Sequence, residues 1–208
     1  MRIDRPAPGE HLHDGPPSTP RLVATVMLLR GGTEYLEVLM VRRSPDAHFM
    51  GGAWVFPGGA VDPADGDGQP GLRSAARREL AEEAGILLNT GVQLVAFAHW
   101  ITPAAVRTRF DTWFYLAQAP PDAQAVADGH EIVDARWISP AQGLAAQARG
   151  ELFLVFPTIR QLQQLSAFDS ASHLLRYAAE REVRPVQPRI IGEGDAARIV
   201  LDEADGDA

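Results

Sequence analysis

Residues 54–88 read WVFPGGAVDPADGDGQPGLRSAARRELAEEAGILL, and this stretch decides the fold. It begins with a short strand-like segment at 54–56. Pro57, Gly58 and Gly59 follow, a sequence that is typical of a tight turn because glycine tolerates unusual backbone angles. The stretch therefore predicts a strand, a sharp break and a helix in close succession.

The second half of the stretch predicts a helix through 77–84 that ends at Gly85, a common C-terminal stop. Apolar residues recur at spacings of three and four, which predicts one buried stripe. That stripe would contain Leu72, Ala75, Ala76, Leu80, Ala84 and Leu87. Glu79, Glu82 and Glu83 would then lie together on the opposite side, with Cβ atoms roughly 5–6 Å apart.

Like charges at this spacing weaken a helix, although Arg78 can pair with Glu82 four residues on. One interpretation is a solvated helix face, which would bind no metal. The other is a site for a hard divalent cation, because Mg²⁺ prefers carboxylate oxygens and shares its coordination with water and substrate phosphates. The glycine turn just upstream favours the second interpretation.

Residues 78–86, RELAEEAGI, match the REUxEExGU core of the Nudix box position for position, where U is aliphatic. The sequence resembles the Nudix hydrolase family on this motif and on the FPGG that precedes it. The family pattern has a glycine, matched by Gly59, and then a glutamate six positions further on. Asp65 stands at that position, and five additional residues separate it from the core, which predicts an enlarged loop at 66–71.

The resemblance implies an α+β fold, a Nudix-type α/β/α sandwich with a mixed β-sheet and additional C-terminal helices. It also implies metal-dependent hydrolysis of the diphosphate bond in a nucleoside diphosphate linked to another moiety. Glu82 and Glu83 are expected to be the principal Mg²⁺ or Mn²⁺ ligands, with Glu79 as a further ligand or the general base. The Gly58 carbonyl would be another ligand, and Arg78 would orient the carboxylates.

A second acidic site is expected beyond the box. In Nudix proteins a carboxylate before a strand resembling the segment at 131–138 often joins the metals or acts as the base, which singles out Glu131. Two arginines at the end of the strand predicted at 35–41 are candidates for binding phosphates, of which Arg42 is the first. Surface charge at a strand end is the alternative interpretation for them.

The strand expected around residues 107–117 alternates two kinds of side chain. One side carries the polar and aromatic residues and is suited to a nucleotide or phosphate ligand, or else holds a structural Arg–Asp pair. That side would contain Arg109, Asp111, Trp113 and Tyr115. The other side, with Phe110, Thr112, Phe114 and Leu116, is expected in the core. Trp54, Trp113 and Tyr115 are candidates for stacking on adenine.

Several segments outside the box resemble the coenzyme A diphosphatase-like branch, typified by peroxisomal acyl-CoA-cleaving enzymes. They are FPGGAVDPAD at 56–65, WITP at 100–103, RFDT at 109–112 and EIV at 131–133. The box itself recognises only a diphosphate. ADP-ribose, NADH and dinucleoside polyphosphates therefore stay open as substrates, as does a catalytically silent, ligand-binding Nudix protein.

Composition limits the function classes. The chain has 208 residues, no cysteine and a net charge of −8, which argues against broad nucleic-acid binding. No apolar run reaches the roughly 18–20 residues of a membrane span, and no secretory signal is evident. These features lead us to expect a cytoplasmic enzyme that acts on a small-molecule nucleotide diphosphate, away from membranes and nucleic acid.

The expected organisation has three parts. Residues 1–20 hold five prolines and predict a disordered arm. Residues 21–191 would form the Nudix domain, with helices at 141–148, 157–165 and 171–181. Residues 192–208 would form an acidic hairpin and tail. In that hairpin, 199–201 would pair with 185–191 at the end of the domain. The last quarter is expected either to pack on the core or to form the surface of a homodimer.

Overall fold

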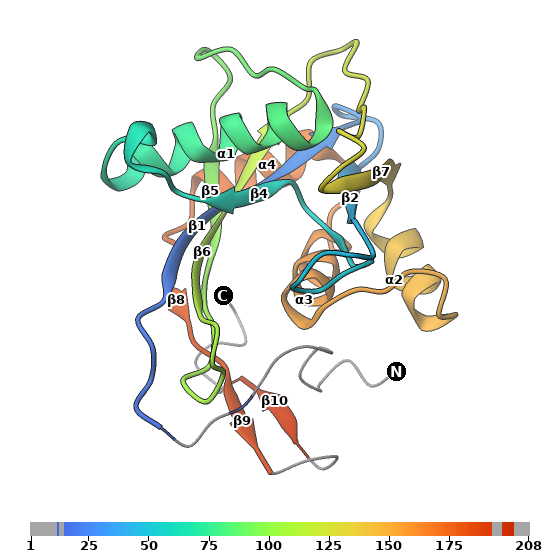
Figure 1. Cartoon of the computed structure of the whole chain (residues 1–208). Coiled ribbons are helices and arrows are strands. Elements are labelled where there is room, and N and C mark those ends of the chain that lie inside the picture. The colour runs from blue at the N-terminus through green and yellow to red at the C-terminus, as the bar shows by residue number, and fades with distance from the viewer. Residues whose placement is uncertain (1–11, 13–14, 193–196, 202–208) are drawn as a thin grey trace.

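A computed structural model describes residues 12, 15–192 and 197–201 (Figure 1). A mixed β-sheet lies between helices on both faces, which confirms the predicted α/β/α sandwich. The main path of the sheet runs β3-β2-β1-β6-β5-β8, while β4 pairs with β1 and β7 pairs with β2. A separate two-stranded sheet, β9 with β10, lies apart from it.

The elements are bounded as follows. The strands are β1 (Arg21–Arg30), β2 (Glu37–Arg43), β3 (Trp54–Val55), β4 (Gly58–Ala60), β5 (Val95–Ile101), β6 (Phe110–Gln118), β7 (Ile132–Ile138), β8 (Pro185–Val186), β9 (Arg189–Ile191) and β10 (Arg198–Val200). The helices are the 3₁₀ turn η1 (Pro63–Asp65), α1 (Gly68–Ala84), α2 (Pro140–Ala148), α3 (Phe156–Leu165) and α4 (Ala171–Ala179).

Strand β1 is the centre of the sheet. It runs parallel to β6 over most of its length and antiparallel to β2 and β4 at its two ends. Its sequence is continuously apolar rather than alternating, because both faces are covered by helices and the strand is buried on each side.

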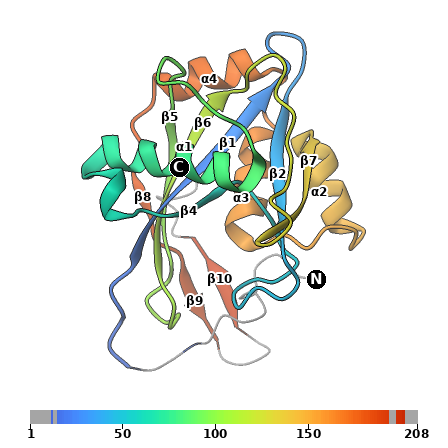
Figure 2. The same cartoon turned by 45° about the horizontal axis from the view of Figure 1, so that its top comes forward.

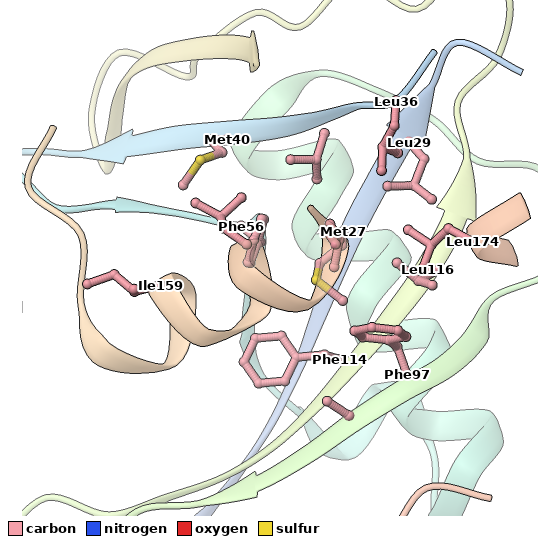
Figure 3. Packing of buried hydrophobic residues seen from close by; sticks show 14 of the residues in the cluster. Met27, Leu29, Leu36, Met40, Phe56, Phe97, Phe114, Leu116, Ile159 and Leu174 are labelled. Atoms are coloured by element: carbon pink, nitrogen blue, oxygen red, sulfur yellow. The ribbon is translucent and has the colours of Figure 1, made fainter. Parts of the chain in front are cut away.

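Two hydrophobic cores result, one on each face. The first contains residues of β1, β2, β5 and β6 together with α2, α3 and α4, and Figure 3 shows part of it around Met27, Phe56, Phe114 and Ile159. The second core lies under α1. It contains Leu72 and Leu80 of that helix, packed against side chains of β1, β2 and β6 on the other face of the sheet. Figure 2 shows α1 crossing in front of the strands, with α4 as a separate helix at the top of the view.

Helix α1 begins earlier than expected. It starts at Gly68, so four of the residues assigned to an enlarged loop at 66–71 belong to its first turn. Pro70 is tolerated there because the first backbone N–H groups of a helix lack partners inside it. The helix ends at Gly85, which has a left-handed φ of 66°, as predicted. The predicted stripe is buried except for Leu87, which lies past the stop and is 80% exposed.

The three C-terminal helices are confirmed. The final hairpin is confirmed only for 189–191, which pairs with 198–200, because Pro185–Val186 pairs with β5 in the main sheet instead. Residues 1–11, 13–14, 193–196 and 202–208 of the predicted arm and tail lie outside the described residues. The described end of the arm is tied down, since Ser18 Oγ donates to the Arg107 carbonyl at 2.8 Å. No helix in the described part of the chain is long and apolar enough to cross a membrane.

Candidate active site

Glycine allows α1 to approach β4 closely. A Cβ atom on Gly59 would lie 2.4 Å from the Glu79 carboxylate, and one on Gly58 would lie 2.5 Å from Thr25 Oγ1. Neither glycine has a positive φ, and both pair with β1 as part of β4. The prediction of a tight turn here was wrong, because the backbone of both glycines is extended. Glycine fits these positions because an added Cβ atom would lie too close to its neighbours.

Glu83 is the most buried acid of the box. It is 4% exposed and accepts a hydrogen bond from the Gly58 N–H at 2.9 Å. Burial raises its pKa to about 8, and the charges of Glu79 and Glu131 act in the same direction. The expectation that all three box glutamates lie opposite the apolar stripe was wrong for Glu83, because it is buried together with the stripe and contacts Gly58 of β4.

Arg78 holds the other acids in place. Its Nη1 donates to Glu79 at 2.7 Å and to Glu82 at 3.0 Å, which includes the predicted pairing four residues on. Its Nε and Nη2 donate to both carboxylate oxygens of Asp65, at 3.1 and 2.9 Å. Nη2 also donates to the Ala60 carbonyl at 2.9 Å. Arg78 therefore connects η1, β4 and α1.

The hydrogen bonds of Arg78 explain part of the pKa shifts of the groups around it. The hydrogen bond from Arg78 lowers the pKa of Asp65, and the bond to Asp65 raises the pKa of Arg78 further. Burial raises the pKa of Glu79, while Arg78 opposes that change. The Glu79 side chain is 15% exposed and that of Glu82 is 58% exposed. The box thus presents one buried, one half-buried and one open carboxylate.

Glu131 reaches the same region from the segment before β7. Its negative charge raises the pKa of both Glu79 and Glu83. Its carboxylate accepts a hydrogen bond from Arg43 Nη2 at 3.1 Å, and its side chain is 59% exposed. The structure therefore brings Glu131 towards the box glutamates, although more than 45 residues separate them in sequence.

A cleft of about 300 Å³ opens beside β4. Arg43 lines it, and Arg42 is not among its lining residues. Arg43 is fixed there by donating to the Phe49 carbonyl at 3.2 Å as well as to Glu131. The cleft is lined by Arg21, Val23, Thr25, Arg43, Phe49, Met50, Val55, Phe56, Gly58, Gly59, Ala60, Phe110, Thr112, Phe114, Val155, Pro157 and Thr158.

The two sides of β6 match their expected roles only in part, since Leu116 and Phe114 lie in the first core as expected. Phe110, Thr112 and Phe114, which were expected in the core, line the cleft, although Phe114 is also packed in the first core. Tyr115 is fully buried on the side of α1, where its hydroxyl donates to Gln69 at 2.9 Å. Trp113 is on that side too and stacks on His99 with ring centroids 4.2 Å apart.

Arg109 and Trp54 also have structural surroundings. Arg109 is 9% exposed and donates to the carbonyls of Thr102 at 3.1 Å and Ser18 at 2.8 Å. Trp54 is 4% exposed, with the Arg136 guanidinium 4.7 Å from its ring centroid. The structure does not bring either of them, or Trp113, to the cleft. The alternative of an Arg109–Asp111 pair was wrong as well, since Asp111 pairs with His99 Nε2 at 2.5 Å.

Sequence reasoning named Gly58 and the pair of arginines that includes Arg43, but it missed Phe110 and its neighbours because both faces of this sheet are apolar. Alternation shows which residues share a face, but it does not show which face opens to solvent. Leu39 and Val41 pack under α1. They would have placed Arg43 on the side of the box had the position of α1 been known.

The donor chemistry fits a hard divalent cation. Carboxylate oxygens of the three box glutamates and Glu131, together with the Gly58 carbonyl, are the ligand type that Mg²⁺ and Mn²⁺ prefer. These acids carry more negative charge than Arg78 and Arg43 offset, and burial, with mutual repulsion in the same direction, raises the pKa of Glu79 and Glu83. No three acidic or histidine side chains within the described ranges converge on one point, because Arg78, Arg43 and the Gly58 N–H hold them.

Comparison with known proteins places this site in a family. The family described as "NUDIX domain" matches residues 19–157. The "Putative nudix hydrolase 7" of Caenorhabditis elegans is 28% identical over 191 residues, and the match covers 75% of this chain and 65% of that protein. The chain therefore spans 65% of the length of this curated relative.

Solved structures agree. The NUDIX hydrolase from Alicyclobacillus acidocaldarius is 27% identical, with a TM-score of 0.69 over 76% of this chain and 96% of that chain. A C. elegans Ap4A hydrolase has the same fold at 20% identity, with a TM-score of 0.53 over 71% of this chain and 96% of that one. From the family match and this geometry, we conclude that the chain belongs to the Nudix family.

Proposed function

We propose that the protein hydrolyses the diphosphate bond of a nucleoside diphosphate linked to another moiety, and that it depends on Mg²⁺ or Mn²⁺. The observation that carries this proposal is the set of acids next to β4, whose glycines line the cleft. Glu79, Glu82 and Glu83 are arranged on α1 by Arg78 and the Gly58 N–H, and Glu131 faces them from the segment before β7.

The three box glutamates and the Gly58 carbonyl would hold the metal. When bound, a divalent cation neutralises phosphate charge and lowers the pKa of water. Phosphate binding and the positioning of the carboxylates are the roles of the chain's own residues. Arg43 lines the cleft and, with one ion pair to Glu131, is placed to bind a phosphate oxygen. Arg78 keeps the glutamates oriented and is itself shielded from substrate by its five hydrogen bonds.

In the reaction, a water oxygen attacks one phosphorus and the bridging P–O bond breaks. The bridging oxygen stays with the other phosphate, and a carboxylate takes the proton from water. Glu79 and Glu131 are the two candidates for that base. Glu131 is the more exposed and is held at the cleft by Arg43, whereas Glu79 is bound to Arg78.

Coenzyme A or an acyl-CoA is the proposed substrate, on the strength of the resemblance in the segments outside the box. ADP-ribose, NADH and dinucleoside polyphosphates are the alternatives, because the acids of α1 address only the diphosphate. A catalytically silent ligand-binding protein is a weaker alternative, since all box glutamates are present.

Product analysis by mass spectrometry tests the proposal. The protein with Mn²⁺ would be given CoA, an acyl-CoA, ADP-ribose, NADH and diadenosine polyphosphates in parallel. Release of 3′,5′-ADP and a phosphopantetheine would support the CoA branch, and preferred release of AMP from ADP-ribose or NADH would support the alternative. Unchanged turnover in folded Glu82→Gln and Glu83→Gln variants would refute the assigned site.

A further inference from the structure

An apolar chamber adjoins the cleft. It has a volume of about 150 Å³, and no charged residue lines it. Four phenylalanines and one tryptophan contribute to the walls, and Thr102 and Thr112 supply its only hydroxyl groups. The lining residues are Phe49, Met50, Trp100, Ile101, Thr102, Pro103, Phe110, Thr112, Phe114, Val155, Phe156, Pro157, Pro188 and Ile199.

The chamber continues the cleft that contains β4. Half of its lining residues also line the cleft, so a molecule held by its diphosphate near Gly58 and Arg43 has the chamber directly beside it. The shared residues are Phe49, Met50, Phe110, Thr112, Phe114, Val155 and Pro157.

One wall comes from beyond the region that matches the family. The match ends at residue 157, whereas Pro188 precedes β9 and Ile199 is in the middle of β10. Figure 1 shows this C-terminal hairpin next to the ends of β5 and β6. Ile199 is 9% exposed, and Ile191, on the opposite strand, is 52% exposed. The hairpin therefore has an inner face toward the chamber and an outer face.

We propose that this chamber binds a compact, uncharged apolar part of the group that the substrate carries on its diphosphate, a part about as large as benzene. A cavity of about 150 Å³ with apolar walls is known to accept a ligand of that size. The inference rests on the proposed function, which supplies the diphosphate, and adds the chemistry of the attached group.

The walls favour an aliphatic or phenyl group over a nucleobase. A purine carries several hydrogen-bonding atoms, and each one buried without a partner costs about 1–3 kcal/mol. The polar side-chain groups available are few: Thr102 Oγ1 already accepts from the Phe110 N–H at 3.0 Å, and Trp100 Nε1 is a single buried donor with no hydrogen-bond partner among the described residues. An alkyl chain or a phenyl ring makes no such demand and gains from burial.

The test uses ADP esters that carry methyl, butyl, hexyl, dodecyl or 6-hydroxyhexyl groups on the second phosphate. Binding is measured by calorimetry with EDTA present, and kcat/KM with Mn²⁺. Burial of one methylene corresponds to about a fourfold gain in affinity. Five additional methylenes separate hexyl from methyl, so we expect the hexyl ester to exceed the methyl ester in both measurements, on the order of 1,000-fold, with no further gain for dodecyl and a loss for 6-hydroxyhexyl.

Ile199→Glu places a charge in the wall and should lower the hexyl-to-methyl ratio at least tenfold. Ile191→Glu is the matched control on the outer face of the same hairpin and should keep the wild-type ratio. Ile199→Val removes a single methylene and keeps the chamber apolar. It shows whether the hexyl-to-methyl ratio changes when the hairpin is only slightly altered. We expect a ratio within about fivefold of the wild-type value.

The chamber and the reaction can fail separately. Equal binding of methyl and hexyl esters, or equal loss of the ratio in both glutamate variants, would overturn the chamber even if every ester is cleaved. A preference for hexyl in calorimetry that disappears in Ile199→Glu would support the chamber, even if no ester is cleaved and the proposed reaction is therefore wrong.

Discussion

The Glu83→Gln substitution should stabilise the metal-free protein at alkaline pH while it removes activity. Glu83 is 4% exposed, and burial raises its pKa from 4.5 to about 8. Glutamine has nearly the same shape and can still accept the hydrogen bond from the Gly58 N–H. The variant therefore removes the buried negative charge and little else.

The sign of the pH dependence follows from the raised pKa. A group that binds its proton more tightly in the folded state contributes stability that is fully present below pH 4.5 and is lost as the pH rises through 8. The difference between the two pKa values corresponds to about 5 kcal/mol at most. Relaxation and water entry reduce such penalties, so we expect a loss of about 1–3 kcal/mol between pH 5 and pH 9.

Urea unfolding in EDTA at pH 5, 7 and 9 measures this loss. The wild type should lose stability over this range relative to Glu83→Gln, and the variant should be the more stable protein at pH 9. Glu82→Gln is the control, because its side chain is 58% exposed and little burial is relieved. Parallel stability curves for wild type and Glu83→Gln would refute the argument that burial of this carboxylate opposes its charge.

Three further substitutions test the geometry of the site. Gly59→Ala places a Cβ 2.4 Å from the Glu79 carboxylate, so kcat should fall at least 100-fold while circular dichroism shows a folded protein; normal turnover would contradict the close approach. Arg43→Ala should lower kcat/KM at least tenfold and Arg42→Ala less than threefold, since only Arg43 lines the cleft; the reverse order would show that the wrong arginine was chosen. Arg78→Lys cannot reproduce a bidentate guanidinium contact, so Mn²⁺ affinity measured by calorimetry should fall about tenfold or more, and unchanged affinity would remove Arg78 from the positioning of the carboxylates.

The sequence was sufficient for the parts of the fold that depend on local chemistry. The helix of the box could be placed because its apolar residues recur at threes and fours and Gly85 ends it in a left-handed conformation. The three C-terminal helices and the β9–β10 hairpin followed from similar local signals. The pairing of Arg78 with Glu82 was also predictable, since it needs only helical spacing.

The sequence was insufficient where the outcome depends on what packs against a strand or helix. Gly58 and Gly59 were assigned to a turn, but the approach of α1 and Thr25 explains them. The face of β6 with Trp113 and Tyr115 looked suited to a ligand, yet α1 covers it. Polar character along one strand does not reveal which side a helix will occupy, so Phe110 and its neighbours were missed.

The most direct test of the central claim is hydrolysis in ¹⁸O-labelled water. The protein would be incubated with Mn²⁺ and the best substrate of the panel, with matched reactions containing EDTA or the Glu82→Gln variant. The proposed function predicts one labelled oxygen in a single phosphate product, formed rapidly with Mn²⁺ and at least 100-fold more slowly in both matched reactions. Equal product formation with EDTA, or with folded Glu82→Gln protein, would contradict metal-dependent hydrolysis at the acids of α1.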